Sequence, residues 1–233
     1  PRSTLFPYTT LFRSGGITWD STAALEFEEC QNKAAFLSAR RPAFSLLESL
    51  LYDGGYFLLD AHLARLAASA AYFGFAVDTG HARTLLLQHA RELGTGAHKV
   101  RLLAARSGAL HVESAPLPPA QPLRVGLAPF PVDSADVFLY HKTTRREVYE
   151  RAGAARPDCD DVILWNERGE ITESRIGNVV LNMGGKLLTP PLDSGLLAGC
   201  FRAHLLGAGK IEEGVLTRQN LAQAQEISLI NSV

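Results

Sequence analysis

The sequence predicts an α/β fold, in the broad sense that includes α+β, with two domains. Strand-like and helix-like segments alternate on both sides of residues 115–122, a stretch of eight residues that contains four prolines. Such a stretch is typical of a linker. The chain has 233 residues, 46% of them hydrophobic, which is enough to fill one large core or two small ones. We therefore expect a small N-terminal domain at residues 42–115, a linker at 116–122 and a larger C-terminal domain at 123–233.

The first residues need separate treatment. Residues 4–14 read T-L-F-P-Y-T-T-L-F-R-S, which resembles the in-frame translation of a common DNA sequencing adapter. We interpret residues 1–14 as a library artefact and exclude them from the fold; an ordinary aromatic-rich strand is the alternative. A short strand is expected next, followed by a helix over Ala23–Ser38, which starts after the capping residues Asp20 and Ser21.

In the small domain, turn and cap residues separate the elements. Phe44–Leu51 is mostly apolar, and Asp53-Gly54-Gly55 predicts a turn into a returning strand. Asp60 is expected to cap a helix whose apolar residues recur at three- and four-residue steps. The elements expected here are strands at Phe44–Leu51 and Tyr56–Leu59, helices from Asp60 to Tyr72 and Ala82 to Leu93, and a hairpin of Lys99–Ala105 with Ala109–Glu113.

The larger domain repeats the alternation. Asn166–Gly169 and Gly184–Gly185 predict the turns of two hairpins. The expected elements are a strand at Leu123–Leu127, a helix at Thr143–Ala155, hairpins of Val162–Trp165 with Glu170–Thr172 and of Val179–Leu181 with Lys186–Leu188, a helix at Gly199–Leu206 and a strand at Glu226–Ile230.

Composition excludes several classes of function. Lys and Arg number 23 and Asp and Glu number 24, so no net charge favours nucleic acid or an anionic membrane. No apolar run approaches the roughly 20 residues that span a bilayer. The three cysteines form no C-x-x-C pair and the histidines no H-E-x-x-H pattern, so neither a disulfide framework nor a metal site is indicated. We expect a cytoplasmic protein without a metal.

Two short phrases suggest chemistry. H-K-T-T-R-R, from His141 to Arg146, contains Lys142, which could form a Schiff base if a partly dry cleft lowered its pKa. I-T-E-S-R-I-G-N, from Ile171 to Asn178, contains Glu173, a carboxylate that could pair with a protonated ring nitrogen. Taken alone, each residue is more commonly an ordinary solvated charge: a surface lysine at the start of a helix and an acid at the end of a strand.

Further segments could bind a phosphate or a substrate. Arg65 could fork onto a phosphate group, or extend along the wet face of its helix. Residues 194–201, S-G-L-L-A-G-C-F, begin a helix whose free N–H groups could form a phosphate seat, and Ser232 could add a hydroxyl. Strand alternation places Leu47 and Ser49 on one face and Glu48 on the other, so Ser49 is either a tolerated small residue or a donor aimed into a pocket.

Read in order, these segments resemble the fold-type IV pyridoxal phosphate enzymes, over residues 44–233. The phrases that carry the resemblance are F-S-L-L-E-S-L, F-L-L-D-A-H-L-A-R-L, H-K-T-T-R, N-E-R-G-E-I-T-E-S and T-P-P-L-D-S-G-L-L-A-G. The resemblance implies a pyridoxal 5'-phosphate cofactor in a cleft between the two domains. It also implies roles: Lys142 as the Schiff-base lysine, Glu173 as the ring-nitrogen partner, and the remaining cofactor-binding residues as Arg65, Asn178, Leu197, Cys200, Phe201 and Ser232.

Within that family the sequence looks most like 4-amino-4-deoxychorismate lyase, which produces p-aminobenzoate and pyruvate in folate biosynthesis. Residues 15–37 resemble the C-terminal end of aminodeoxychorismate synthase component I, a chorismate-binding enzyme that some bacteria fuse to the lyase in this order. We therefore expect residues 15–41 to be a synthase tail and linker, aminodeoxychorismate to be the substrate, and Ser49 to take part in catalysis by protonating the departing pyruvate.

Alternatives remain open. Both chemistries use the same cofactor contacts, so the chain could be an aminotransferase of branched-chain or D-amino acids. It could also be an inactive fragment of a fusion protein, because it stops at Val233, where relatives continue.

The family often has proline at the position of Ala198. This difference still leaves the backbone N–H groups of the segment able to bind a phosphate. Relatives are commonly homodimers, so a homodimer is expected, and either Arg101 or His141 is a candidate contact for the substrate carboxylate.

Overall fold

The structure, a computed structural model, describes residues 22–24, 26–29 and 43–233. The chain divides into two compact units, Pro1–Ala43 and Phe44–Val233. In the first unit the described residues 23, 24 and 26–29 are helical, within the helix predicted for Ala23–Ser38. The rest of that helix, the short strand before it and the segment interpreted as an artefact lie outside the described residues.

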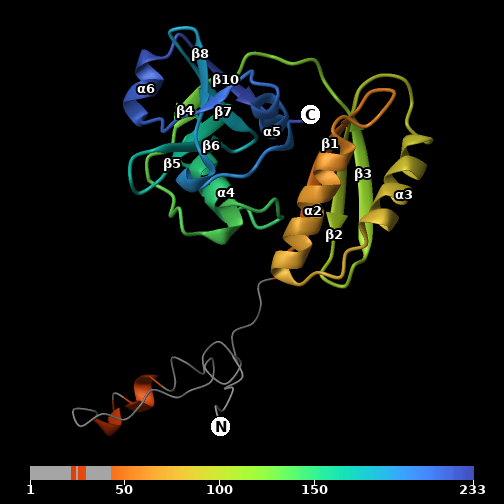
Figure 1. Ribbon diagram of the computed structural model, residues 1–233, viewed down its shortest axis with the longest axis horizontal. Helices are drawn as coiled ribbons and strands as arrows, with labels where there is room; N and C mark the ends of the chain where they lie inside the picture. Colours follow the sequence, from red (N-terminus) through yellow and green to blue (C-terminus); the bar gives the residue numbers. More distant parts are fainter. Residues whose placement is uncertain (1–21, 25, 30–42) are drawn as a thin grey trace, which may run out of the picture. The chain divides into compact units, whose positions relative to one another are not determined.

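Residues 44–116 of the second unit form what we call the small lobe, in which two helices cover one face of a three-stranded antiparallel sheet (Figure 1). Its core consists of aliphatic side chains from the helices and from alternate strand positions, as a half-buried sheet requires. The predicted hairpin around Ser107-Gly108 is confirmed. The elements are β1 (Leu46–Tyr52), α2 (Leu59–Phe73), α3 (Thr79–Ala90), β2 (His98–Ala104) and β3 (Leu110–Pro116).

Two predictions in the small lobe are wrong. The returning strand at Tyr56–Leu59 does not form: Tyr56 makes only an isolated bridge to Tyr52, and α2 already begins at Leu59. The residue before α2, Leu58, adopts a left-handed conformation with φ 54°, which turns the chain directly into the helix. Asp60 therefore lies in the first turn of α2 instead of capping it, and its carboxylate pairs with Arg83 of α3.

Residues 125–233 form the large lobe, a mixed seven-stranded sheet with short helices around it (Figure 1). The strand order is β4-β5-β6-β7-β8-β9, and β10 pairs with β7; β4 with β5 and β8 with β9 are parallel, the other pairs antiparallel. The elements are β4 (Val125–Leu127), α4 (Glu147–Ala154), β5 (Asp161–Trp165), β6 (Ile171–Ser174), β7 (Asn178–Met183), β8 (Lys186–Thr189), α5 (Cys200–Gly207), β9 (Glu212–Glu213), α6 (Arg218–Gln223) and β10 (Glu226–Ile230).

The two lobes have separate hydrophobic cores, and the mixture of sheets and helices confirms the predicted fold class. Helix α4 begins four residues later than predicted. Thr143 forms a bridge with Leu46 of β1, and its hydroxyl accepts a hydrogen bond from the Arg145 N–H at 3.2 Å. These contacts keep the residues after Lys142 out of the helix.

Strand β1 connects the lobes through its free edge. The Leu47 N–H donates to the Lys142 carbonyl at 3.0 Å, and the Leu51 N–H donates to the Ser232 carbonyl at 3.1 Å. Between these two residues lies Ser49, whose backbone has the same orientation because successive residues of a strand alternate. Strand β1 therefore holds three residues that the sequence selects for the site, Ser49, Lys142 and Ser232, next to one another.

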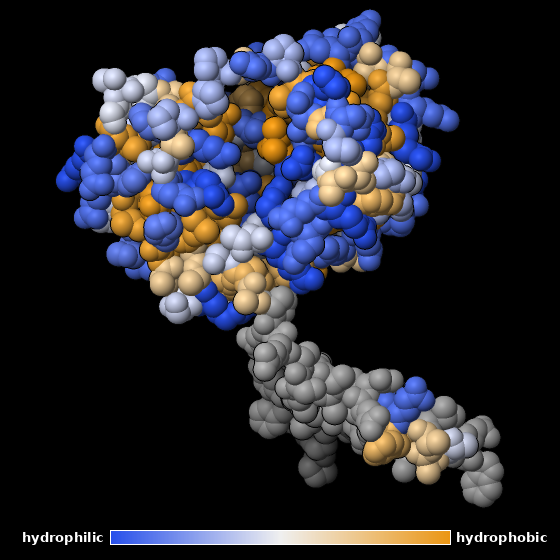
Figure 2. Space-filling model, turned by 180° about the vertical axis from the view of Figure 1, so that it is seen from behind, coloured by the Kyte–Doolittle hydropathy of each residue, from blue (hydrophilic) through white to orange (hydrophobic). Residues whose placement is uncertain are grey.

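Across the described ranges no helix is both long and apolar enough to span a bilayer, and no three His, Cys, Asp or Glu side chains come together in a way that suits a metal ion. The face of the molecule in Figure 2 carries hydrophilic and hydrophobic residues in small, interspersed areas, and its surface is hollowed.

Candidate active site

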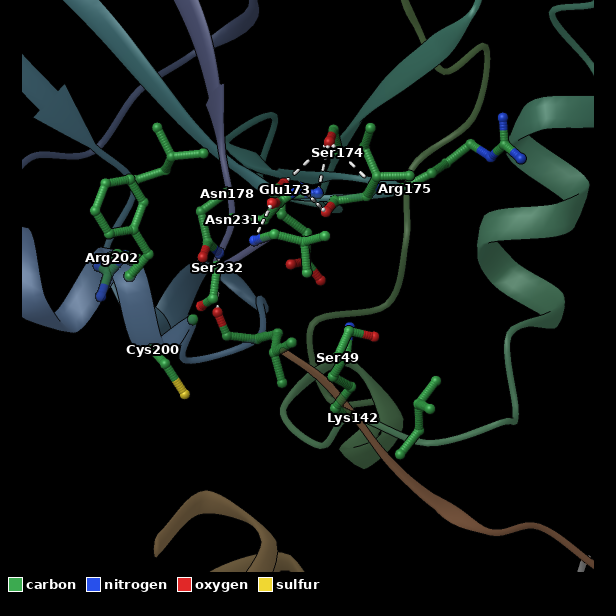
Figure 3. Close-up of a pocket in the computed structure, with 18 of the residues that line it drawn as sticks. Ser49, Lys142, Glu173, Ser174, Arg175, Asn178, Cys200, Arg202, Asn231 and Ser232 are labelled. Carbon is green, nitrogen blue, oxygen red and sulfur yellow. Dashed lines mark hydrogen bonds between the residues drawn. The ribbon is translucent and has the colours of Figure 1, made fainter. Parts of the chain in front are cut away.

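A cavity of about 440 Å³ is lined by residues of both lobes. Figure 3 shows ten of its residues labelled, with Lys142 and Ser49 in the lower part of the view and Glu173 and Asn178 above them. The structure places all of the predicted catalytic and cofactor-binding residues at this one cavity: Ser49, Arg65, Lys142, Glu173, Asn178, Leu197, Cys200, Phe201 and Ser232.

The two candidates for a substrate carboxylate are separated by the structure. Arg101, opposite Ser49 in the small sheet, lines the cavity. His141 is not among the lining residues: its Nδ1 lies 2.9 Å from the Ser69 hydroxyl, and its ring packs against Tyr72. His141 therefore contributes to packing between α2 and the loop that carries Lys142.

The environment of Lys142 favours a neutral amine. Burial, and next the positive charge of Arg65, lower the pKa of Lys142 to about 8. Its own carbonyl is fixed by the N–H of Leu47. With this pKa about one amine in ten is neutral at pH 7, far more than for a lysine at its ordinary value of 10.5, and both imine formation and proton abstraction require the neutral amine.

Glu173 is a buried carboxyl, not the solvated acid that the sequence also allowed. It lies in β6 opposite Asn178 of β7 and is 4% exposed. Burial raises the pKa of Glu173 to about 7, although the Tyr149 hydroxyl, which donates to its Oε1 at 2.7 Å, and the backbone N–H of Leu197 lower it. No described cation forms an ion pair with Glu173, so the side chain is suited to a cationic group bound in the cavity.

Arg65 is held by Glu48, which points from β1 toward α2. The Nε and Nη2 of Arg65 donate to the two carboxylate oxygens of Glu48 at 3.0 and 2.5 Å. The Nη1 of Arg65 donates to the Ala198 carbonyl at 3.1 Å. His62 Nδ1 lies 2.7 Å from the same carboxylate. Burial alone would raise the pKa of Glu48, but Arg65 and His62 bring it to about 2. Arg65 thus presents a fixed cation beside the start of α5.

The N-terminus of α5 is packed closely against β7. The Asn178 Nδ2 donates to the Leu197 carbonyl at 2.9 Å, and a Cβ on Gly199 would lie only 2.0 Å from the Asn178 Oδ1. Only glycine fits at this approach. Cys200 and Phe201 follow at the first positions of α5, where backbone N–H groups have no acceptor within the helix.

Ser232 reaches the cavity because β10 ends close to the β6–β7 turn. A Cβ on Gly177 would lie 2.7 Å from the Ile230 carbonyl oxygen, so a side chain there would push the end of β10 away. Ser232 is 8% exposed and lines the cavity two residues beyond Ile230.

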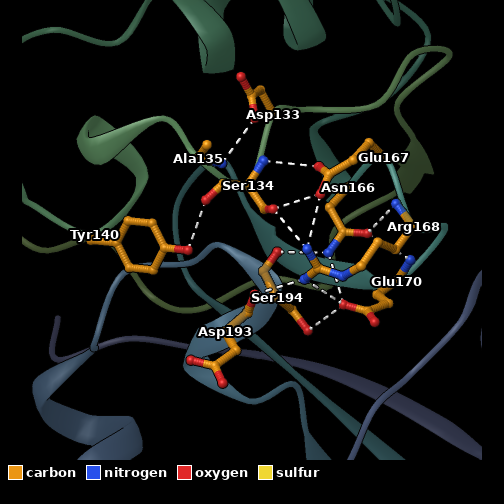
Figure 4. A network of polar contacts seen from close by, with 10 residues as sticks. All are labelled: Asp133, Ser134, Ala135, Tyr140, Asn166, Glu167, Arg168, Glu170, Asp193 and Ser194. Carbon is orange, nitrogen blue, oxygen red and sulfur yellow. Dashed lines mark hydrogen bonds and ion pairs between the residues drawn. The ribbon is translucent and has the colours of Figure 1, made fainter.

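A second polar network holds three of the loops that lead into the site (Figure 4). Arg168 Nη1 donates to the Ser134 hydroxyl at 2.8 Å, and Arg168 Nη2 donates to the Asp193 carbonyl at 2.7 Å. The buried Asn166 donates to the Ser194 carbonyl at 2.9 Å. The loop before Lys142, the hairpin before Glu173 and the loop before α5 are therefore joined outside the cavity.

Several residues that line or support the cavity were not selected from the sequence, among them Glu48, His62, Lys99, Arg146 and Tyr149. His62 and Arg65 are three residues apart on α2, so they share a helix face, and this spacing was a usable signal. Tyr149 gave no such signal, because an aromatic residue in a short amphipathic helix usually belongs to a core.

The lining residues fit the chemistry of pyridoxal phosphate. Lys142 is an amine with a lowered pKa, suited to an aldehyde. Glu173 is a buried carboxyl without a cationic partner, suited to a pyridinium nitrogen. Arg65 and the start of α5 offer a guanidinium and free N–H groups, suited to a phosphate.

Comparisons with known proteins agree with this geometry. The family model "Amino-transferase class IV" matches residues 45–233. A Schizosaccharomyces pombe protein named "Putative aminodeoxychorismate lyase" is 32% identical over 198 residues, which cover 81% of this chain and 85% of that protein. A crystal structure of a "Putative amino-acid aminotransferase" from Mesorhizobium loti is 37% identical, covers 82% of this chain and 95% of its own, and superposes with a TM-score of 0.76.

A second solved structure concerns the cofactor. It is described as "A hypothetical aminotransferase from Mycobacterium tuberculosis, alpha-ketoglutarate and PMP bound form", and it shares the fold at 24% identity and a TM-score of 0.72, covering 84% of this chain and 80% of its own. From the match over residues 45–233, the chain belongs to the class IV aminotransferase family, whose members depend on pyridoxal phosphate.

Proposed function

We propose that the chain is a pyridoxal phosphate-dependent lyase that converts 4-amino-4-deoxychorismate to p-aminobenzoate and pyruvate. The observation that carries the proposal is the position of Ser49 in the same cavity as Lys142 and Glu173, between the two β1 residues that bind the Lys142 and Ser232 segments. A lyase needs a proton donor in addition to the lysine base, and Ser49 offers a hydroxyl there.

The residues that would hold the cofactor follow from the geometry. Arg65, the N–H groups of Cys200 and Phe201 and the Ser232 hydroxyl would bind its phosphate. Glu173 would keep a proton on its ring nitrogen, and Lys142 would hold its aldehyde. When bound, pyridoxal phosphate supplies an aldehyde that captures an amine and a ring that accepts electrons.

The chain's own groups account for the proton movements. The Lys142 amine takes the proton from C4 of the substrate. The C3–O bond breaks and releases enolpyruvate, and the Ser49 hydroxyl gives a proton to its methylene carbon, which makes pyruvate. The remaining ring is aromatic p-aminobenzoate. In each cycle Lys142 gains one proton and Ser49 loses one. A proton therefore has to pass from Lys142 to Ser49 before the next turnover.

Charge in the cavity suits this substrate. Aminodeoxychorismate carries two carboxylates, and Lys99 and Arg101 of β2 line the cavity beside Ser49. Arg101 pairs with Glu113 across the sheet, with both side chains partly exposed. Partly exposed pairs are weak, so Arg101 can exchange this partner for a carboxylate of a ligand at little cost.

The second candidate is an amino-acid aminotransferase. It is favoured by the 37% identity to the protein from Mesorhizobium loti, whose description names that activity. The two candidates share the proposed cofactor contacts and differ in the need for Ser49.

One assay separates them. The purified chain with pyridoxal phosphate is incubated with aminodeoxychorismate, or with an amino acid and 2-oxoglutarate, and p-aminobenzoate, pyruvate and glutamate are measured. The lyase proposal expects p-aminobenzoate and pyruvate in equal amounts; glutamate instead would establish the aminotransferase. Neither product, from a chain that binds the cofactor, would indicate an inactive fragment.

Ser49 has its own test. Ser49→Ala should lower kcat by about 100-fold, as loss of a proton donor typically does, with little change in cofactor binding. Ser107→Ala, in the β2–β3 turn, is the matched control. Unchanged turnover in Ser49→Ala would remove Ser49 from the mechanism.

A further inference from the structure

We propose that Tyr149 and Arg146 are positioning residues that keep Glu173 ionised and oriented toward the cofactor's ring nitrogen. The inference rests on the proposed function in one respect: it takes Glu173 as the partner of that nitrogen. Neither residue was selected by sequence, and both line the cavity.

Tyr149 acts directly on the carboxyl. It lies in the first turn of α4, is 7% exposed, and its hydroxyl donates to Glu173 Oε1 at 2.7 Å. Burial, and next the charge of Glu173, raise the pKa of Tyr149 well above its usual value, so the hydroxyl keeps its proton. A permanent donor on one carboxylate oxygen fixes the plane of the carboxyl and leaves the other oxygen for a ligand.

Arg146 acts on Tyr149 and on the turn that follows Glu173. Its guanidinium carbon lies 4.2 Å from the centre of the Tyr149 ring, a cation–π contact. Its Nη2 donates to the Arg175 carbonyl, two residues after Glu173. The start of α4 is thus bound to β6 through Tyr149 and Glu173, and to the turn after β6 through Arg146 and Arg175.

The charges around Glu173 come from three elements. Lys142 lies in the loop before α4, Arg146 at the N-cap of α4, and Arg65 on α2. None forms an ion pair with Glu173. The hydrogen bond from the Tyr149 hydroxyl opposes the effect of burial most, followed by the Leu197 backbone N–H and the more distant charges of Lys142 and Arg146. With the Tyr149 hydroxyl in place, the pKa of Glu173 is about 7, so about half of the carboxyl groups are ionised near neutral pH. Without it the pKa rises further and fewer are ionised, and a neutral carboxyl does not stabilise a pyridinium ion.

The test is the dissociation constant of pyridoxal phosphate, measured by fluorescence titration at pH values below and above about 7, the pKa of Glu173. Tyr149→Phe should weaken binding on the order of 10-fold below that pH, as expected for a lost hydrogen bond to a charged group. The ratio of the dissociation constant of the variant to that of the wild type should fall toward one at higher pH, where Glu173 is ionised in both proteins. Lys142 titrates in both proteins, so its effect cancels in the ratio.

Two further variants make the outcome decisive. Tyr56→Phe loses a hydroxyl that donates to the Leu86 carbonyl at 2.9 Å, away from the cavity, and should bind like wild type at every pH. Arg146→Gln removes the cation over Tyr149 and should weaken binding about 3-fold with the same pH trend.

Two outcomes would overturn the inference. If Tyr149→Phe and Arg146→Gln weaken pyridoxal phosphate binding by the same factor at every pH, the two residues have only a packing role. If neither variant weakens binding, they do not act on Glu173 at all. If Tyr149→Phe does not fold, Arg146→Gln alone decides. Failure of the wild-type chain to bind pyridoxal phosphate would overturn the proposed function itself.

Discussion

The ion pair of Glu48 and Arg65 is the residue-level feature on which the phosphate end of the cavity depends. Glu48 is 2% exposed and accepts hydrogen bonds from both Arg65 and His62. Glu48→Gln leaves the Arg65 guanidinium in place with no anion, and breaking one side of a buried pair destabilises by about 3 kcal/mol. We expect this loss in urea denaturation at neutral pH, together with weaker pyridoxal phosphate binding.

The pH dependence of this loss has a defined sign. The pKa of Glu48 falls from 4.5 to about 2 on folding, so its contribution is complete above about pH 4.5 and disappears as pH falls toward 2. The difference between wild type and Glu48→Gln should shrink over that window. Asp60→Asn, which breaks the exposed pair with Arg83, is the control and should change stability by less than about 1 kcal/mol. A Glu48→Gln protein as stable as this control would contradict the account.

The direction in which a site side chain points was predictable where the local backbone conformation determines it. Alternation along β1 separates Ser49 from Glu48, and the structure places Ser49 at the cavity and Glu48 against α2. The partners of Glu48 and Glu173 were not predictable. Tyr149 meets Glu173 across 24 residues of sequence, a contact set by the packing of α4 on the sheet and not by any local pattern.

Among the elements, α5 depends on glycine at its start. Gly199→Ala places a methyl group 2.0 Å from the Asn178 Oδ1, so either Asn178 or the first turn of α5 must move. We expect at least about a 10-fold loss of pyridoxal phosphate affinity, since small displacements of binding groups are expensive. Gly207→Ala, in the last turn of the same helix, has open space around its Cβ and should bind normally, with a gain in stability of up to about 1 kcal/mol. Equal affinities for the two variants would show that the start of α5 does not contact the cofactor.

The hairpin before Glu173 depends on Asn166, which is fully buried. Its amide donates to Glu170 and to the Ser194 carbonyl, and its oxygen accepts from the N–H groups of Arg168 and Glu170. Asn166→Ala leaves several buried groups unpaired and should destabilise by about 2–4 kcal/mol in urea denaturation. Asn182→Ala, in β7, removes one acceptor, for the Gly185 N–H in the turn that follows, and should destabilise by less than half as much. A loss no larger than in this control would mean that solvent replaces the network.

The prediction of elements succeeded where hydrophobic periodicity and turn residues agree. The β2–β3, β5–β6 and β7–β8 hairpins and strand β10 lie at or within a few residues of the predicted ranges. It failed where a long-range contact overrides propensity. Leu58 takes a left-handed conformation that no local signal indicates, and the bridge between Thr143 and Leu46 delays the start of α4. Helix α6 was missed, because six residues carry too little periodicity.

Considering the molecule as a whole, the cavity takes residues from both lobes, so a bound cofactor should stabilise them together. At a pyridoxal phosphate concentration 100-fold above its dissociation constant, the expected stabilisation is about 2.7 kcal/mol. For a unit of this size that corresponds to a rise in Tm of roughly 5–10 °C. Calorimetry should show one transition that moves as a unit. Two transitions, only one of which responds to the cofactor, would contradict coupling of the lobes through β1.

The most direct test of the central claim is to locate the attachment of pyridoxal phosphate on the chain. The protein is incubated with the cofactor, reduced with borohydride, digested and examined by peptide mass spectrometry. The account predicts a single modified peptide that contains Lys142, formed more readily as pH rises through about 8, the pKa of that amine. Attachment scattered over exposed lysines away from the cavity, such as Lys186 and Lys210, with none at Lys142, would contradict it.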